Sequence, residues 1–189
     1  MRKKRWNRWP RAAVCLGVVV SLLAAWPGGA ESAAETAAAP TPREILDPWT
    51  GTWAGEFKVY TQDGRLTTLL SVRQTYRWDG DIQRARFEEI DQDGNVVTAE
   101  AKNYWDDQGR LICEVVKSTG DTSQHFGRYS DGYLFWYGSK PGRIETFRER
   151  VEVDPDGQRT YTITGFGAYG RGDNQKHFLF EGKYAEVQP

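Results

Sequence analysis

The chain has 189 residues, with 25 basic and 26 acidic side chains and a formal net charge of −1. Six of the basic residues and none of the acidic ones precede residue 31, so the remainder of the chain carries a net charge of −7. An acidic surface repels phosphate backbones and anionic lipid, and the remaining basic residues are scattered singly along the sequence. We therefore expect no nucleic-acid partner.

The first 30 residues have the pattern of a secretory signal peptide. Arginine and lysine occur without acids up to residue 11, an apolar run covers residues 12–26, and small residues follow up to Ala30. The run is shorter than the roughly 20 apolar residues of a membrane-spanning helix. We predict cleavage near Ala30, a periplasmic or secreted protein, and no stable membrane insertion after cleavage. An uncleaved N-terminal anchor is the alternative.

Residues 31–47 are rich in alanine and proline, and we predict a flexible linker there, with a short helix in residues 33–39 as the alternative. Cys113 is the only cysteine after the predicted signal, which excludes an intrachain disulfide in the exported portion. The stability of that portion must come from a hydrophobic core. About 140 residues remain, which is enough for one domain.

From residue 48 onward, turn signals recur at nearly even intervals. Asp-Gly pairs are frequent among them, and such pairs favour tight primed hairpins because glycine takes a positive φ. Nine turns separate ten strands, and an open sheet of that size would expose unpaired backbone groups. We predict an all-β fold, a single up-and-down antiparallel β-barrel over residues 48–187. The turns lie at residues 63–64, 79–80, 93–94, 108–109, 119–120, 131–132, 141–142, 156–157 and 171–174.

Alternation along the strands predicts an inward face that carries aromatic and amide side chains. Polar residues on this face indicate a lined cavity, in which aromatic rings supply buried area and amides orient the polar end of a ligand. The third, sixth and seventh strands do not alternate cleanly, so we assign no facing to them. The candidate ligand-binding residues are Trp53, Phe57, Gln74, Tyr76, Trp78, Asn103 and Trp105.

The first strand opens with Gly-Thr-Trp-Ala-Gly-Glu-Phe at residues 51–57. Gly51 and Trp53 match the Gly-x-Trp motif of the calycin superfamily, and with the meander behind it the chain resembles bacterial exported lipocalin-like domains of uncharacterised function. The resemblance covers residues 48–187. It implies that Trp53 closes one end of the barrel and that a basic side chain from a late strand covers its ring, for which Lys183 is the candidate. It also implies a ligand pocket more than a reaction.

Nitrobindin-type barrels also begin with Gly-Thr-Trp-x-Gly and carry a haem-ligating histidine on the final strands, where this chain has His177. However, Phe178 and Phe180 share an inward parity, which turns His177 outward. We therefore expect a surface histidine, and a haem-binding barrel remains an alternative function. For His125, in a strand without a clear facing, we expect a structural or exposed role.

Three motifs suggest cofactor or metal binding, and their context opposes it. The Gly-x-Gly-x-x-Gly pattern at residues 165–170 leads into another strand rather than a helix, so we expect these glycines to permit a bulge or bend near the rim. The acidic segment 91–95 lacks the calcium-loop spacing, and a type I′ hairpin accounts for it. Two histidines and one available thiol cannot form a zinc cluster. We expect no cofactor and no metal.

No nucleophile elbow and no zinc-protease motif occurs in the sequence. Cys113 shares a face with Leu111 and Val115, which is typical of inert packing. We therefore expect a protein that is not an enzyme and that sequesters a small, largely apolar molecule inside the barrel. An envelope interaction module, filled by its own side chains and without a ligand, is a further alternative.

Overall fold

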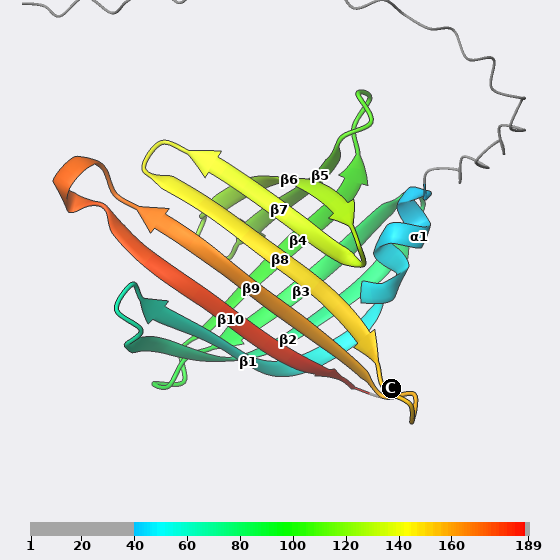
Figure 1. The fold of residues 1–189 in the computed structure, drawn as a ribbon, viewed down its shortest axis with the longest axis horizontal. Coiled ribbons are helices and arrows are strands. Elements are labelled where there is room, and N and C mark those ends of the chain that lie inside the picture. The colour runs from blue at the N-terminus through cyan, green and yellow to red at the C-terminus, as the bar shows by residue number, and fades with distance from the viewer. Residues whose placement is uncertain (1–39, 188–189) are drawn as a thin grey trace, which may run out of the picture. The chain divides into compact units, whose positions relative to one another are not determined.

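The computed structural model describes residues 40–187, which form a closed barrel of ten antiparallel strands (Figure 1). Each strand pairs with its neighbours in sequence, and β1 pairs with β10 to close the sheet. The predicted up-and-down barrel is confirmed. The predicted signal peptide lies outside the described residues. The strands are β1 (Gly51–Thr61), β2 (Leu66–Asp79), β3 (Ile82–Ile90), β4 (Val96–Trp105), β5 (Leu111–Lys117), β6 (Thr122–Ser130), β7 (Tyr133–Lys140), β8 (Arg143–Val153), β9 (Arg159–Tyr169) and β10 (Lys176–Glu186).

The hairpins lie where the turn signals predicted them, but the type I′ turn predicted for residues 91–95 is wrong. There the N–H of Gly94 donates to the carbonyl of Asp91 at 3.1 Å, and only the glycine has a positive φ, of 83°. This is a type I turn followed by a left-handed glycine. The carboxylate of Asp91 also accepts the backbone N–H of Asn95, which stabilises this turn. The turn at Asp131 and Gly132 is type I′, because these two residues have positive φ values of 53° and 78°.

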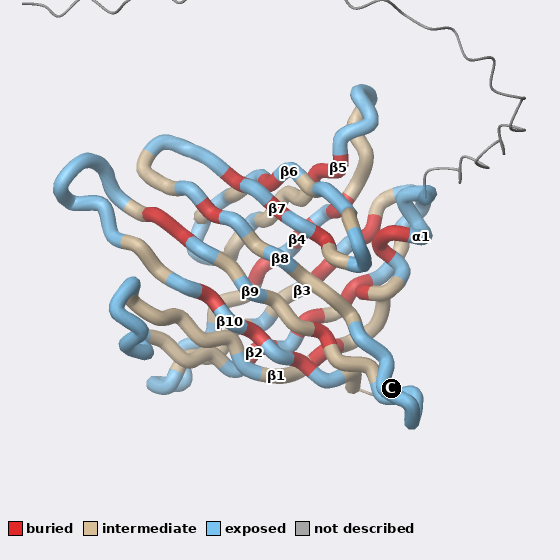
Figure 2. The backbone as a smooth tube through the Cα atoms, viewed as in Figure 1, coloured by how far each residue is buried: buried red, intermediate tan, exposed pale blue. Residues whose placement is uncertain are grey.

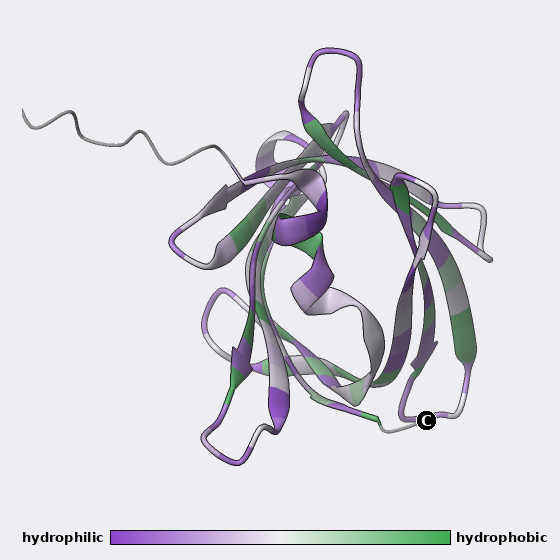
Figure 3. Cartoon of the chain, turned by 90° about the vertical axis from the view of Figure 1, so that its right-hand side faces the viewer, coloured by the Kyte–Doolittle hydropathy of each residue, from purple (hydrophilic) through white to green (hydrophobic). Residues whose placement is uncertain are grey.

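A short helix, α1 (Pro42–Leu46), and a 3-10 turn, η1 (Asp47–Trp49), lie across one end of the barrel (Figure 3). Thr41 and Glu44 form a capping box at the start of α1. Ile45 and Leu46 are buried, and the side chain of Gln83 donates to the carbonyl of Leu46 at 2.8 Å. The flexible linker predicted for residues 31–47 therefore extends too far toward the C-terminus, because Ile45 and Leu46 pack into the core of the barrel domain. Within residues 40–187, no helix is long and apolar enough to cross a membrane.

Trp53 lies at the end that α1 and η1 cover, and its side chain is completely buried. Its indole N–H donates to the carbonyl of Trp49 at 2.8 Å, and the ring packs edge-on against Tyr161 at 5.6 Å. The guanidinium of Arg159 lies 4.9 Å from the Trp53 ring centroid, which is a cation–π geometry. Arg159 also forms an ion pair with Glu186. One arginine therefore joins β9 to the tryptophan and to β10.

The prediction that Lys183 covers Trp53 is wrong. Lys183 is exposed and is the register partner of Glu56, whereas Trp53 is the partner of Glu186. Successive strand residues point to opposite faces, and Lys183 lies one residue from the inward Tyr184. Buried positions recur in this alternating manner along the strands (Figure 2). Parity therefore directs Lys183 outward.

We expect Arg159→Ala to lower the free energy of unfolding by about 1–3 kcal/mol, because it removes the cation–π contact and leaves Glu186 without its partner. Urea denaturation followed by tryptophan fluorescence measures this change. The matched control is Lys183→Ala, for which the change should stay within about 0.5 kcal/mol. Equal effects of the two substitutions would contradict the assignment of Arg159 as the residue that covers Trp53.

Candidate functional site

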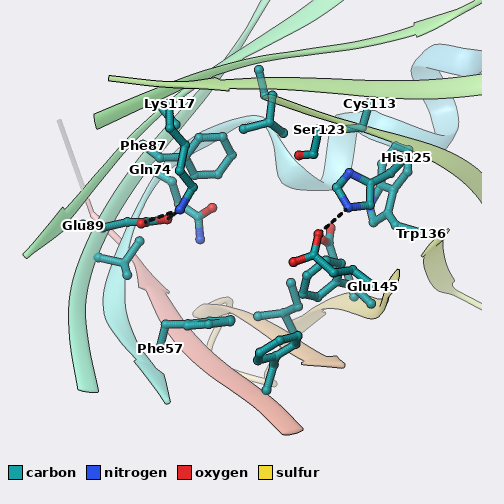
Figure 4. Close-up of a pocket in the computed structure, with 18 of the residues that line it drawn as sticks. Phe57, Gln74, Phe87, Glu89, Cys113, Lys117, Ser123, His125, Trp136 and Glu145 are labelled. Carbon is teal, nitrogen blue, oxygen red and sulfur yellow. Dashed lines mark hydrogen bonds and ion pairs between the residues drawn. The ribbon is translucent and has the colours of Figure 1, made fainter. Parts of the chain in front are cut away.

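The barrel encloses a cavity of about 350 Å³, to which all ten strands contribute side chains (Figure 4). This volume lies within the range of roughly 300–1,000 Å³ that is typical of small-molecule sites. The cavity contradicts the alternative of a barrel filled by its own side chains. Most of the lining is apolar; most of the charged groups lie toward the open end of the barrel, and Glu149 and further polar groups lie toward the closed end.

Four of the predicted ligand-binding residues line this cavity, namely Phe57, Gln74, Tyr76 and Asn103. The hydroxyl of Tyr76 donates to the side-chain oxygen of Gln74 at 3.0 Å. The amide nitrogen of Asn103 donates to Gln83 at 3.0 Å, whereas the buried amide oxygen of Asn103 has no hydrogen-bond partner among the described residues. The sequence therefore placed both amides correctly on the inner wall.

The three predicted tryptophans are not among the residues that line the cavity. Trp53 is part of the closed end. The indole of Trp78 donates to Asp47 at 2.6 Å, and the guanidinium of Arg43 lies 4.4 Å from its ring. Trp105 is partly buried and packs against the core cluster. All three lie near the strand ends beside α1 and η1, so their distance along the barrel axis keeps them from the cavity.

One wall of the cavity is a stack of three phenylalanine rings. Phe57 and Phe180 have centroids 5.8 Å apart, and Phe180 and Phe147 have centroids 5.5 Å apart. A Cβ atom at Gly165 would come within 2.7 Å of the Phe147 ring, and one at Gly167 within 2.6 Å of the Phe180 ring. The bulge predicted at these glycines is wrong, since β9 pairs there without a register shift. The glycines instead make room for the rings.

A network of charged side chains lies toward the open end, centred on the carboxylate of Glu145. His125 lies 3.3 Å from this carboxylate and Arg143 lies 2.9 Å from it, while the hydroxyl of Tyr169 donates to its other oxygen. Arg143 also pairs with Asp121. Burial acts to raise the pKa of Glu145, but the hydrogen bonds from His125, Tyr169 and Arg143 lower it to about 2. Glu145 is therefore ionised at neutral pH.

A second ion pair joins Lys117 of β5 to Glu89 of β3, with 2.8 Å between nitrogen and oxygen. Figure 4 shows this pair on one side of the cavity and the pair of His125 and Glu145 on the other. Lys117 balances the charge of Glu89, and Arg143 balances that of Glu145. The open end of the cavity is thus polar but holds little unbalanced charge.

A hollow of about 360 Å³ adjoins the network from the side of the barrel. β6 and β7 pair from the hairpin up to Phe126 and Tyr137, and beyond these residues the two strands have no paired positions. Lys140 bridges the gap by donating to the carbonyl of Thr122 at 2.6 Å. His125 lines both the hollow and the inner cavity. Its side chain therefore lies between the hollow and the inner cavity.

Glu149 of β8 also lines the cavity. Desolvation by burial raises its pKa to about 7. Hydrogen bonding from the side chains of Trp136 and Tyr161 offsets part of this rise. Glu145 and Glu149 thus share a strand and a facing, yet their proton affinities are shifted in opposite directions. Glu145 has the cationic partner Arg143, and Glu149 has no cationic partner within residues 40–187.

His125, Glu145 and Glu149 are the functional candidates that sequence reasoning missed. Alternation of apolar residues does not reveal them, because β6 and β8 place polar and charged side chains on the inward face. The sequence of β8 does contain a signal for the facing of the two glutamates. Phe147 lies two positions from each of them, so all three side chains point to the same face of the strand. The inward position predicted for Cys113 is confirmed, and burial raises the pKa of its thiol.

His177 is not a cavity residue. Its Nδ1 atom lies 3.1 Å from the side-chain oxygen of Gln62, and its ring packs at 5.6 Å from Phe166, an exposed residue of β9. The predicted outward direction is confirmed, and His177 cannot ligate a haem bound inside the barrel. No group of three or more histidine, cysteine, aspartate or glutamate side chains within residues 40–187 could hold a metal ion.

No protein-family model and no curated protein matches the chain. Among solved structures, the S-type phycobiliprotein lyase CPES from Guillardia theta is similar, with a TM-score of 0.57 and 8% identity over 78% of this chain and 93% of the lyase. Rv2717c from M. tuberculosis has a TM-score of 0.49 and 10% identity over 79% of this chain and 99% of its own. A de novo designed fluorescence-activating β-barrel has a TM-score of 0.37 and 12% identity over 76% and 97%. The similarity to the lyase shows a shared barrel fold.

We expect Glu145→Gln to destabilise the protein at neutral pH by on the order of 3 kcal/mol, because Arg143 then lacks its buried partner. The folded-state pKa of Glu145, about 2, lies below its ordinary value of 4.5. Its contribution to stability is therefore present above pH 4.5 and is lost as the pH falls toward 2. Urea unfolding of wild type and variant across this range should show the difference shrinking. A difference that is independent of pH, or one matched by the exposed Glu152→Gln, would contradict this account.

Proposed function

We propose that this protein is exported and sequesters a small, largely apolar molecule inside its barrel. The observation that carries the proposal is the cavity of about 350 Å³, with its stacked wall of Phe57, Phe180 and Phe147. Transfer of apolar surface from water yields about 25 cal/mol per Å², so such a wall can bind a ligand without a reactive group. The pattern of the first 30 residues supports export.

Kinship with calycin barrels is part of the same proposal. Its support is the position of Trp53 at the covered end, together with a late-strand arginine over its ring. The fold shared with a phycobiliprotein lyase adds support for the barrel alone. We propose binding rather than catalysis because the sequence contains no nucleophile elbow and no zinc-protease motif, and because Glu145 is ionised as an ion-pair partner of Arg143.

The neighbouring residues Val115 and Val116 provide a matched test of where the ligand binds. Val115 lines the cavity and Val116 is exposed on the outer face. We expect Val115→Phe to weaken the binding of 2-(1-naphthyl)ethanol, a neutral and largely apolar probe, by about tenfold or more, because the added ring occupies ligand volume. Isothermal titration calorimetry measures the affinity, and Val116→Phe should leave it unchanged.

Thermal melts of both variants establish that each is folded before the titration. Equal affinities of wild type and both variants would place the probe outside the cavity. The absence of heat with wild type, for this probe and for 1-decanol, would count against a binding function for the barrel.

A further inference from the structure

The carboxyl group of Glu149 is surrounded by aromatic side chains from four other strands. Tyr76, Tyr161 and Tyr184 line the cavity from β2, β9 and β10; burial raises their pKa values, and the nearby charge of Glu149 raises them further. Trp136 of β7 completes the group. We refer to these four aromatic residues as the aromatic cluster. Tyr161 also contacts Trp53, so the cluster lies toward the closed end of the barrel.

Glu149 lacks a positively charged neighbour. Within residues 40–187, no lysine, arginine or histidine side chain lies within ion-pair distance of it. The other charged residues of the cavity pair with one another toward the open end. A carboxylate in a largely apolar cavity is costly without a cation, and natural proteins that retain one often use it to bind a ligand. The titratable groups that face Glu149 are Tyr76, Cys113, Tyr161 and Tyr184.

Asn103 also lines the cavity, and its buried amide oxygen is a second polar group without a hydrogen-bond partner among the described residues. The exposed fraction of Asn103 is only 5%. Its amide nitrogen is held by Gln83, which fixes the oxygen as the free end. A buried carbonyl oxygen accepts hydrogen bonds and cannot donate them. A ligand group that satisfies it must therefore carry an N–H or O–H.

We propose that the cavity binds a protonated amine, with the ammonium group of the ligand against Glu149 and the aromatic cluster and its apolar body along the phenylalanine stack. This inference rests on the proposed binding function and assigns its ligand class. A carboxylate, an acceptor amide and the electron-rich faces of aromatic rings all attract an ammonium group. The net charge of −7 after residue 30 also attracts cations from solution.

The other head groups fit this environment less well. An anionic head would lie beside the carboxylate of Glu149 without a cation to offset the repulsion. A neutral hydroxyl can donate to Asn103, but it leaves the charge of Glu149 unbalanced. An ammonium group carries the charge that balances Glu149 and has three donors for acceptor groups of the cavity wall.

Three probes with one naphthalene body separate these cases, namely 2-(1-naphthyl)ethylamine, 2-(1-naphthyl)ethanol and 1-naphthaleneacetate. We expect the amine to bind the full-length protein about tenfold or more tightly than the alcohol at about pH 8, with the acetate weakest. Calorimetry measures all three affinities. If the alcohol binds as tightly as the amine, the inference fails while the proposed binding function stands. If none of the probes binds, the proposed function itself fails.

Glu149→Gln keeps the shape of the side chain and removes its charge. We expect this variant to lose the preference for the amine, about tenfold, and to bind the alcohol as wild type does. Glu152→Gln, on the same strand but exposed, should retain the preference. A preference that survives in Glu149→Gln would overturn the assignment of the ammonium site.

The pH dependence of amine binding supplies a further test. An alkylammonium group has a pKa of about 10, so it stays charged throughout the neutral range. Glu149 has a pKa of about 7 and becomes protonated below it. Affinity for the amine should fall by about five- to tenfold between about pH 8 and pH 6 in wild type and stay constant in Glu149→Gln. An affinity that rises as the pH falls would contradict the proposal.

The stability of the ligand-free protein shows whether Glu149 truly lacks a cation. Its folded-state pKa of about 7 lies above its ordinary value of 4.5, so ionisation removes stability as the pH rises through this window. We expect Glu149→Gln to melt at or above the wild-type temperature at about pH 8, with the difference shrinking toward about pH 5. A variant that melts below wild type at the higher pH would show that a protein cation already pairs with Glu149, and the ammonium site would be excluded.

Discussion

Closure of the sheet between β1 and β10 is the constraint on which the rest of the structure depends. A closed antiparallel sheet has no free edge, and every second side chain must enter one shared interior. At one end this interior is sealed by α1, η1 and the buried Trp53, with Arg159 over its ring. Because glycines 165 and 167 face inward, the rings of Phe147 and Phe180 can stack along the wall rather than fill the centre.

The interior that results is graded in polarity along the barrel. The open end carries ion pairs that are satisfied within the protein, with Glu145 held by Arg143 and His125. The middle is apolar. Toward the closed end, Glu149 has aromatic neighbours but no cation. Such an arrangement is suited to a ligand with an apolar body and a polar head, since each part then meets a matching section of the wall.

Strand β8 shows that the charged and hydrogen-bonding neighbours of a carboxyl group, rather than its burial alone, decide its protonation state. Glu145 and Glu149 are four residues apart on β8 and both point inward. Hydrogen bonds and a nearby guanidinium lower the pKa of Glu145 to about 2, whereas desolvation raises that of Glu149 to about 7. Within β8, Arg143 lies two residues from Glu145 and pairs with it, whereas the other partners of Glu145, His125 and Tyr169, come from β6 and β9.

The sequence by itself determined the number of strands, their order, the antiparallel barrel and the inward facing of Phe57, Gln74, Tyr76 and Asn103. These features follow from turn residues and from a period of two, which are local properties of the chain. The tertiary structure alone decided which cation covers Trp53, which tryptophans reach the cavity, and that His125 lies beside Glu145. Position along the barrel axis and contact across the interior depend on strand register and closure, which bring together residues far apart in sequence.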